Sequence, residues 1–360
     1  MPNRRRHRAL IFLLIFIVVY FGVMAYPAIR ILTLALPSWQ PGTPALLAIF
    51  VLPLLPRLAQ IRWNNRFTRA ASALAFTWLG LCFQLFPLVL AFEIVNALVG
   101  LPAQPSGFAL AGTALLLAIA GFIVARRLHL RTIALPAPAA LAGKSLVQIT
   151  DVHLGSRPAA LLERIVRRIE AVAPDYVVIT GDLVDEHGID AAWFAPLKRI
   201  EAPIYYVIGN HERYVDLDAI IEGLAQTGVE VLRGRAVRDG PITLIGIDDA
   251  EAKDTVAHGL AALEAGGEYR VLLYHRPRGF EDAARAGIDL MLSGHTHDGQ
   301  IIPFNWIVHR VFPRSRGLFR IGASRLYVSP GTGTWGPMLR LGSRSEITRF
   351  VFEEAAPAGD

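Results

Sequence analysis

Cysteine is almost absent from this 360-residue sequence, which contains a single one, Cys82. One thiol per chain excludes an internal disulfide framework and any metal site built on several thiolates. The redox compartment is therefore not indicated by the sequence, and a metal site in this chain must use oxygen and nitrogen ligands.

Acidic residues are also scarce, but only in the N-terminal part of the chain. Residues 1–135 contain twelve arginines and one acid, Glu93, whereas the remainder contains 24 basic and 29 acidic residues. The formal net charge of +6 therefore originates in the N-terminal part. Because the rest of the chain is slightly acidic, the composition does not favour a nucleic acid as a partner.

Long apolar runs occupy the same N-terminal part. A helix needs roughly 20 apolar residues to cross a bilayer. We expect a transmembrane region at residues 1–131, with four spans at about 9–26, 44–58, 73–95 and 108–125. Arginine clusters precede the first span, separate the second from the third, and follow the fourth. The positive-inside rule then predicts a multi-pass protein of the cytoplasmic (inner) membrane, with the N-terminus and the C-terminal domain on the cytoplasmic side.

Two alternatives concern this region. The paired arginines before the first run resemble a twin-arginine export signal, which the three later runs disfavour. Glu93 is either a functional acid within a span or an interfacial residue. A span that begins near Ala73 brings Glu93 to the far interface after about 20 residues at 1.5 Å each, which favours the interfacial position.

A change of composition separates this region from a second domain. Residues 132–143 are uncharged and rich in proline and alanine, so we expect a linker there. A domain follows at 144–354, with a tail at 355–360. Short apolar runs alternate in the domain with amphipathic segments such as 159–172, which indicates an α/β fold. Strands are expected at 145–150, 176–180, 203–209, 242–247, 269–274, 288–293, 325–329 and 348–353.

Polar residues follow five of these strands, in the segments DVH, GDLVD, GNHE, HRP and GHTH. Open α/β sheets place their ligands at the carboxyl ends of strands. One such residue is weak evidence, but five segments form a pattern. Imidazole and carboxylate ligands in this number suit a two-metal site for manganese, iron, zinc or nickel. The candidates are Asp151, His153, Asp182, Asn210, His211, His275, His295 and His297.

These segments, in this order, resemble the calcineurin-like metallophosphoesterase superfamily. The resemblance implies a four-layer αββα sandwich of two mixed sheets and a binuclear metal centre, with manganese as the leading metal. It implies that one ion is bound by Asp151, His153 and His297 and the other by Asn210, His275 and His295, with Asp182 bridging them. It also implies catalytic roles for His211, near the leaving group, and for Asp185, which orients it. Two cations would lower the pKa of a bridging water, so that a hydroxide is available for hydrolysis near pH 7.

Two positions depart from the pattern of the superfamily. Glu186 stands where its phosphoprotein phosphatases have a phosphate-binding arginine, which disfavours that branch. Asp298 stands where the membrane-associated branch usually has a glycine. The continuation GQIIP and the late segment 327–342 nevertheless resemble that branch, which includes multi-pass membrane metallophosphoesterases and UDP-2,3-diacylglucosamine pyrophosphatases of lipid A biosynthesis.

The segment 303–325 has two interpretations that its pattern does not separate. Its aromatic and aliphatic residues alternate with arginines, as in a flap that lies at a membrane interface. The same alternation fits a hairpin with one face on the core and arginines in solvent.

The sequence thus predicts a membrane-anchored hydrolase of a phosphodiester or pyrophosphate bond, acting on a phosphorylated lipid or a lipid-linked nucleotide. An alternative is a soluble nucleotide or a phosphoprotein as the substrate. Another is a catalytically silent metal-binding scaffold attached to a membrane module. The sequence does not indicate an oligomeric state.

Overall fold

A computed structural model describes residues 14, 17–40, 42–263 and 266–355. The chain divides into two compact units. The first comprises residues 1–123 together with Gly336–Leu339, and the second comprises Val124–Trp335 together with residues 340–360. The expected tail at 355–360 lies outside the described residues except for Ala355.

The first unit is built from apolar helices. They are η1 (Val18–Ala25, a π-helix), α2 (Tyr26–Ala35), α3 (Thr43–Val51), α4 (Leu55–Arg62), α5 (Arg66–Val99) and α6 (Ala103–Arg126). Among the described residues, three segments are long and apolar enough to cross a membrane: Val18–Ala35, Arg66–Val99 and Ala103–Arg126. The pair formed by α3 and α4, bent by 50°, would make a fourth.

The first apolar segment continues beyond the end expected at residue 26. Residues 9–13 and 15–16 lie outside the described residues, and the described helix extends to Ala35. Pro27 lies in the first turn of α2, where a backbone N–H is not needed, so it does not end the helical segment. Glu93 on α5 forms an ion pair with Arg30 on α2, with Arg30 Nη2 at 3.1 Å from Glu93 Oε2. This acid is therefore neutralised within the first unit.

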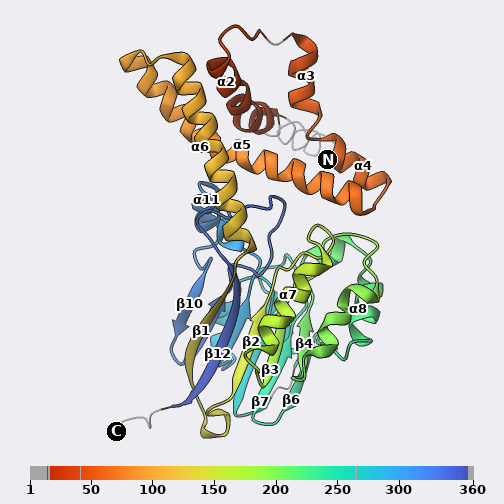
Figure 1. The fold of residues 1–360 in the computed structure, drawn as a ribbon. Helices are drawn as coiled ribbons and strands as arrows, with labels where there is room; N and C mark the ends of the chain where they lie inside the picture. Colours follow the sequence, from red (N-terminus) through yellow and green to blue (C-terminus); the bar gives the residue numbers. More distant parts are fainter. Residues whose placement is uncertain (1–13, 15–16, 41, 264–265, 356–360) are drawn as a thin grey trace, which may run out of the picture. The chain divides into compact units, whose positions relative to one another are not determined.

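The second unit contains two mixed six-stranded sheets (Figure 1). The first has the strand order β1-β12-β2-β3-β4-β5. Its strands are β1 (Leu128–Ala137), β2 (Ser145–Ile149), β3 (Tyr176–Thr180), β4 (Ile204–Val207), β5 (Glu230–Val231) and β12 (Ser345–Glu354). Strands β2, β3 and β4 are parallel neighbours, so their carboxyl ends meet at one edge.

The second sheet has the order β10-β11-β9-β8-β7-β6. Its strands are β6 (Arg235–Asp239), β7 (Ile242–Gly246), β8 (Tyr269–Leu273), β9 (Leu290–Ser293), β10 (Gly317–Ile321) and β11 (Ser324–Val328). Strands β7, β8 and β9 are also parallel neighbours. The eight expected strands are thus all present, although their ends differ by up to two or three residues.

The structure corrects the prediction of a linker at residues 132–143. Most of its first half belongs to β1, which pairs in parallel with β12 from Leu128 to Ala137. Figure 1 shows the two strands side by side. Pro136 obscured the strand in the sequence, but β1 is an edge strand, where a missing N–H is tolerated. A short 3-10 turn, η2 (Ala139–Leu141), follows, so this segment is part of the sheet domain.

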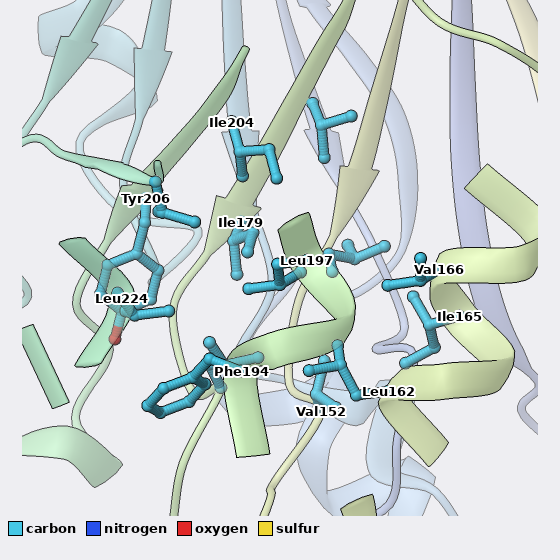
Figure 2. Packing of buried hydrophobic residues seen from close by; sticks show 14 of the residues in the cluster. Val152, Leu162, Ile165, Val166, Ile179, Phe194, Leu197, Ile204, Tyr206 and Leu224 are labelled. Carbon is cyan, nitrogen blue, oxygen red and sulfur yellow. The ribbon is translucent and has the colours of Figure 1, made fainter. Parts of the chain in front are cut away.

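Helices pack on the first sheet through a buried apolar cluster. Leu162, Ile165, Val166 and Ile169 form one face of α7 (Ala159–Glu170). Figure 2 shows this face turned toward Leu197 of η3 (Ala191–Arg199), with Ile179 of β3 nearby. The spacing of three and four residues explains why α7 is a helix with one buried face. The remaining helices are α8 (Leu217–Ala225), α9 (Thr255–Ala261), α10 (Phe280–Arg285) and α11 (Phe304–Val311), with the 3-10 turns η4 (His211–Tyr214) and η5 (His297–Gly299).

Two further apolar clusters complete the core of the second unit. One contains buried side chains of both sheets, including Val178 and Tyr205 from the first and Leu273 and Leu292 from the second. The other joins α9 and α10 to the second sheet. Burial on both sides explains why β2, β3 and β7 read as continuous apolar runs rather than as alternating ones.

Candidate metal centre

The predicted ligands follow parallel strands of both sheets. Asp151 and His153 follow β2, Asp182 follows β3, and Asn210 and His211 follow β4. In the second sheet, His275 follows β8, and His295 and His297 follow β9. Because the carboxyl ends of parallel neighbours meet at one edge, each sheet delivers its polar residues to one place.

Asp151, His153 and His297 form the first group of these side chains. One potential ligand atom of each lies within 4.8 Å of the others. His153 Nε2 is 3.1 Å from His297 Nε2, and His297 Nε2 is 3.3 Å from Asp151 Oδ1. All three side chains are buried. Imidazole nitrogens and a carboxylate oxygen that converge in this way are typical of a metal site.

Asp182, His275 and His295 form the second group, again with ligand atoms within 4.8 Å of one another. His275 Nδ1 donates to the carbonyl of Thr180 at 2.8 Å, which leaves Nε2 to face Asp182 Oδ2 at 3.0 Å. Asn210 was expected beside this group. Its Oδ1 is buried and has no hydrogen-bond partner among the described residues, as is expected of an oxygen that binds a cation.

The two groups adjoin each other. The backbone N–H of His295 donates to both carboxylate oxygens of Asp151, at 3.1 Å each. The backbone N–H of His211 donates to Asp182 Oδ1 at 2.9 Å. Asp182 Oδ2 therefore lies near two imidazoles, at 3.0 Å from His275 Nε2 and 4.0 Å from His211 Nε2.

Asp185 lies beside two histidines. Its Oδ2 is 3.2 Å from His153 Nδ1, and ligand atoms of Asp185, His153 and His211 all lie within 4.8 Å of one another. The backbone N–H of Ser156 donates to Asp185 Oδ1 at 3.0 Å, and the Ser156 hydroxyl donates to Oδ2. The sequence predicts that Asp185 orients His211, whereas its direct contact in the structure is with the metal-binding candidate His153.

The candidate ligands differ in their protonation states. Burial and the nearby His275 lower the pKa of His295 to about 3, and burial and His153 hold that of His297 well below its ordinary value. Burial opposes ionisation of Asp182, but the charge of His275 and a hydrogen bond to it hold its pKa well below the ordinary value. Burial opposes protonation of His275, but the charge of Asp182 and a hydrogen bond to it raise the pKa of His275 to about 10, so this histidine must lose a proton before its Nε2 can bind a metal ion.

The backbone of the site is strained. Among the described residues, eight other than glycine have a positive φ, and five of them are the candidates Asp151, His153, Asp182, His295 and His297. Such conformations are rare outside glycine and cluster at functional sites. Gly294 allows the two sheets to approach here, because a Cβ at this position would lie 2.3 Å from Asp151 Oδ2.

Two buried residues support the site without having been assigned this role from the sequence. The Glu212 carboxylate accepts N–H groups of Asp182, Val184 and Gly209 at 2.8–3.1 Å, and thereby joins the segments after β3 and β4. Glu212 is the last residue of the GNHE segment, so the signal was present. Arg340 is fully buried and donates to carbonyls that include those of Gly333, at 2.7 Å, and His297, at 3.3 Å. Burial excludes it as a residue that lines an open substrate pocket.

Asp298 occupies a left-handed backbone position, with φ at 51°. Its carboxylate is buried and lies 2.7 Å from His309 Nε2 and 2.8 Å from Arg316 Nη1. Here the charged side chain ties the segment after His297 to α11 and to the start of the β10–β11 hairpin.

The donors present fit metal ions. The site combines carboxylate, imidazole and amide groups, and the buried Oδ1 of Asn210 has no hydrogen-bond partner within the described ranges. Oxygen and nitrogen donors of this kind suit manganese, iron or zinc. The structure thus brings six of the seven predicted ligands into two groups, while the place of Asn210 among them and the metal that they bind stay predictions.

Comparisons with known proteins identify the family. The family model of the calcineurin-like phosphoesterases matches residues 144–299. An uncharacterized metallophosphoesterase of Aquifex aeolicus is 33% identical over 217 residues, which cover 56% of this chain and 82% of that protein. A dimetal phosphatase from Danio rerio, a solved structure, is 13% identical with a TM-score of 0.32, covering 52% of this chain and 87% of the other.

A vertebrate relative is named as a transmembrane protein. The transmembrane protein with metallophosphoesterase domain of Bos taurus is 35% identical over 243 residues, which cover 61% of this chain and 55% of that protein. The chain therefore spans about half the length of this relative.

Proposed function

The chain belongs to the calcineurin-like phosphoesterase family, and on that premise we propose that it is a metal-dependent hydrolase of phosphoester or phosphoanhydride bonds. The observation that carries the proposal is the convergence of two adjoining groups of ligands, Asp151, His153, His297 and Asp182, His275, His295. A catalytically silent scaffold would have no need of the additional His211 beside them.

Each residue has a role in this proposal. Asp151, His153 and His297 would hold one ion, and Asn210, His275 and His295 the other, with Asp182 between them and manganese as the leading candidate. Two cations held there would polarise the phosphate and supply a water of lowered pKa. Most of these side chains are buried, which would limit the access of bulk water to the ions.

His211 is the proposed proton donor. Its side chain is 22% exposed, so it reaches the open side of the site, whereas the ligands of the first group are buried. Burial lowers the pKa of His211, and the carboxylates of Asp182 and Asp185 oppose this shift. Because the net shift is downward, the imidazolium form would give up its proton readily to the departing oxygen, while only a minor fraction of His211 carries that proton near pH 7.

We further propose a lipid or lipid-linked nucleotide, such as UDP-2,3-diacylglucosamine, as the substrate. An apolar segment adjoins the site, because the Phe312 ring at the end of α11 lies 5.4 Å from that of His295, centroid to centroid. Trp306, Ile307 and Val311 on α11 are more than half exposed. These side chains form a surface suited to acyl chains or to a membrane interface, in agreement with the flap interpretation.

The arrangement in the membrane belongs to the same proposal. We propose four spans, with the bent pair α3 and α4 as the second, and a catalytic domain on the cytoplasmic side with αββα layers. The three long apolar helices and the arginine clusters of the sequence support it.

The test uses the full chain in detergent, loaded with manganese. Hydrolysis of bis(p-nitrophenyl) phosphate and of UDP-2,3-diacylglucosamine is measured, together with bound metal. Asp182→Asn should abolish both activities and lower the metal content. His211→Ala should keep the metal and slow turnover by about 10²- to 10⁴-fold. The matched control is His258→Ala, which changes an exposed histidine on α9.

The substrate arm uses Trp306→Gln combined with Ile307→Gln. This variant should lose hydrolysis of the lipid and retain that of bis(p-nitrophenyl) phosphate. Equal loss of both, or full activity on UDP-glucose alone, would favour a soluble substrate. Full activity of Asp182→Asn would overturn the mechanism, and bound metal without turnover of any phosphoester would favour the scaffold.

A further inference from the structure

An arginine-lined pocket lies outside the metal centre, entirely within the second unit. It is open and has a volume of about 710 Å³, and its lining includes Arg126, Arg127, His129, Arg164, Arg167 and Arg168. The first three surround the junction of α6 and β1, and the last three belong to α7. None of these residues is a metal-binding or catalytic candidate.

The three arginines of α7 share one stripe of the helix. Their spacing of three and four residues aligns them, while Leu162, Ile165, Val166 and Ile169 form the buried stripe. The acids of α7 point elsewhere, because Glu163 and Glu170 both pair with Arg199, at 2.9 and 3.2 Å. No acidic side chain of the described chain lies within 4.0 Å of Arg164, Arg167 or Arg168.

A hydrogen bond fixes this stripe next to the end of α6. Arg164 Nη2 donates to the carbonyl of Arg126, and the Ser345 hydroxyl donates to the carbonyl of Ala125 at 2.9 Å. Burial and the charges of Arg126, Arg167 and Arg168 lower the pKa of Arg164. Like charges that repel one another thus lie close together around the pocket, and an anion bound there would reduce this repulsion.

The length of α6 indicates which anion is available to the pocket. The helix has 24 residues, and at 1.5 Å per residue this length crosses a hydrocarbon layer of about 30 Å. Arg126 is its last residue, so in a membrane it would lie at the level of the lipid phosphates. The positive-inside rule accounts for Arg126 and Arg127 alone, whereas the α7 arginines are placed by the packing of the sheet domain.

From this juxtaposition we propose that the pocket between α7 and the end of α6 binds the headgroup of an anionic phospholipid. Arginine guanidinium groups bind phosphate oxygens in pairs, and basic pockets next to membrane helices bind such headgroups. The site is independent of the proposed hydrolase activity, because it shares no residue with the metal centre.

The test is native mass spectrometry of the full chain in a neutral detergent, titrated with phosphatidylglycerol or phosphatidylcholine. Wild type should bind phosphatidylglycerol in preference to phosphatidylcholine. Replacing Arg164, Arg167 and Arg168 with glutamine should weaken binding of phosphatidylglycerol by about 10- to 100-fold, as expected for three arginines near a lipid surface. The control replaces three exposed cations elsewhere, as Arg235→Gln, Arg238→Gln and Lys253→Gln, and should bind as wild type does.

Further arms keep the proposal falsifiable. Arg167→Gln with Arg168→Gln retains the hydrogen bond of Arg164 and should still weaken binding, so it serves if the triple variant fails to fold. Unchanged binding of phosphatidylglycerol in both variants would overturn the proposal. It would also fail if inorganic phosphate displaced the lipid at equal concentration, because the pocket would then be a site for soluble anions.

Discussion

The two groups of candidate ligands are supported by different parts of the chain. In the first group, side chains support the ligands: Asp185 contacts His153, and Arg340 donates to the carbonyl of His297. In the second group, the histidine His275 is fixed by a main-chain group, the carbonyl of Thr180, while the Glu212 carboxylate holds only the backbone N–H of Asp182. His295 is also less buried than the ligands of the first group. A site supported by side chains can be weakened by substitutions outside the ligands, and one supported by carbonyls is less sensitive to them.

This difference predicts a large and selective effect of Asp185→Asn. Loss of the charge beside His153 should weaken the metal affinity of the first group, or the activity, by about 10- to 100-fold, since partners of metal-binding histidines have effects of this size. The second ion should be retained. Metal content per chain and isothermal titration measure both ions, and we expect one ion rather than two at limiting metal.

The matched control for Asp185→Asn is Asp216→Asn, which removes a carboxylate at the same distance of 3.2 Å from an exposed histidine, His187. It should leave both ions in place. Equal loss of the two ions from Asp185→Asn would show that the groups do not differ in their support.

A second prediction concerns the place where the two groups meet. In Gly294→Ala the new methyl group would lie 2.3 Å from both Asp151 Oδ2 and Thr150 Oγ1. We expect the free energy of unfolding of the second unit to fall by about 1–3 kcal/mol, as in other overpacked sites. Gly266→Ala, whose Cβ has nothing within 4 Å, is the control. Thermal unfolding followed by circular dichroism measures both, and equal melting temperatures would contradict the close approach.

The sequence predicted those parts of the molecule that depend on local patterns. The family and the two mixed sheets are confirmed, and the residues after β2, β3, β4, β8 and β9 lie together as expected. Strand ends carry this information locally, because the apolar run and the polar residue that follows are adjacent in the chain.

Features that depend on distant contacts were missed. The local sequence of β1 does not predict a strand, because the partner that pairs with it, β12, lies about 200 residues later in the chain. The contact between Asp185 and His153, and the burial of Arg340 behind His297, likewise result from packing between strands and loops. The arginine pocket combines residues of two elements that no local pattern relates. The segment 303–325 fits neither of its two interpretations alone, since it comprises a helix, α11, and one strand of a hairpin.

The smallest effect is expected at Asp298, next to the first group. Asp298→Asn removes the charge that faces His309 and Arg316, whose side chains are 47% and 46% exposed, so screening limits the loss to about 1 kcal/mol or less. Asp298→Gly loses the same contacts, but a glycine adopts the φ of 51° without strain. The relief of strain offsets about 1 kcal/mol of the lost stability. We therefore expect Asp298→Gly to be as stable as wild type within about 1 kcal/mol and more stable than Asp298→Asn.

Both variants should retain two ions, unlike Asp185→Asn, because Asp298 contacts α11 and the hairpin rather than a ligand side chain. Loss of the first ion from Asp298→Gly would show instead that the charge of Asp298 holds His297 in place, and that the support of this group extends to α11.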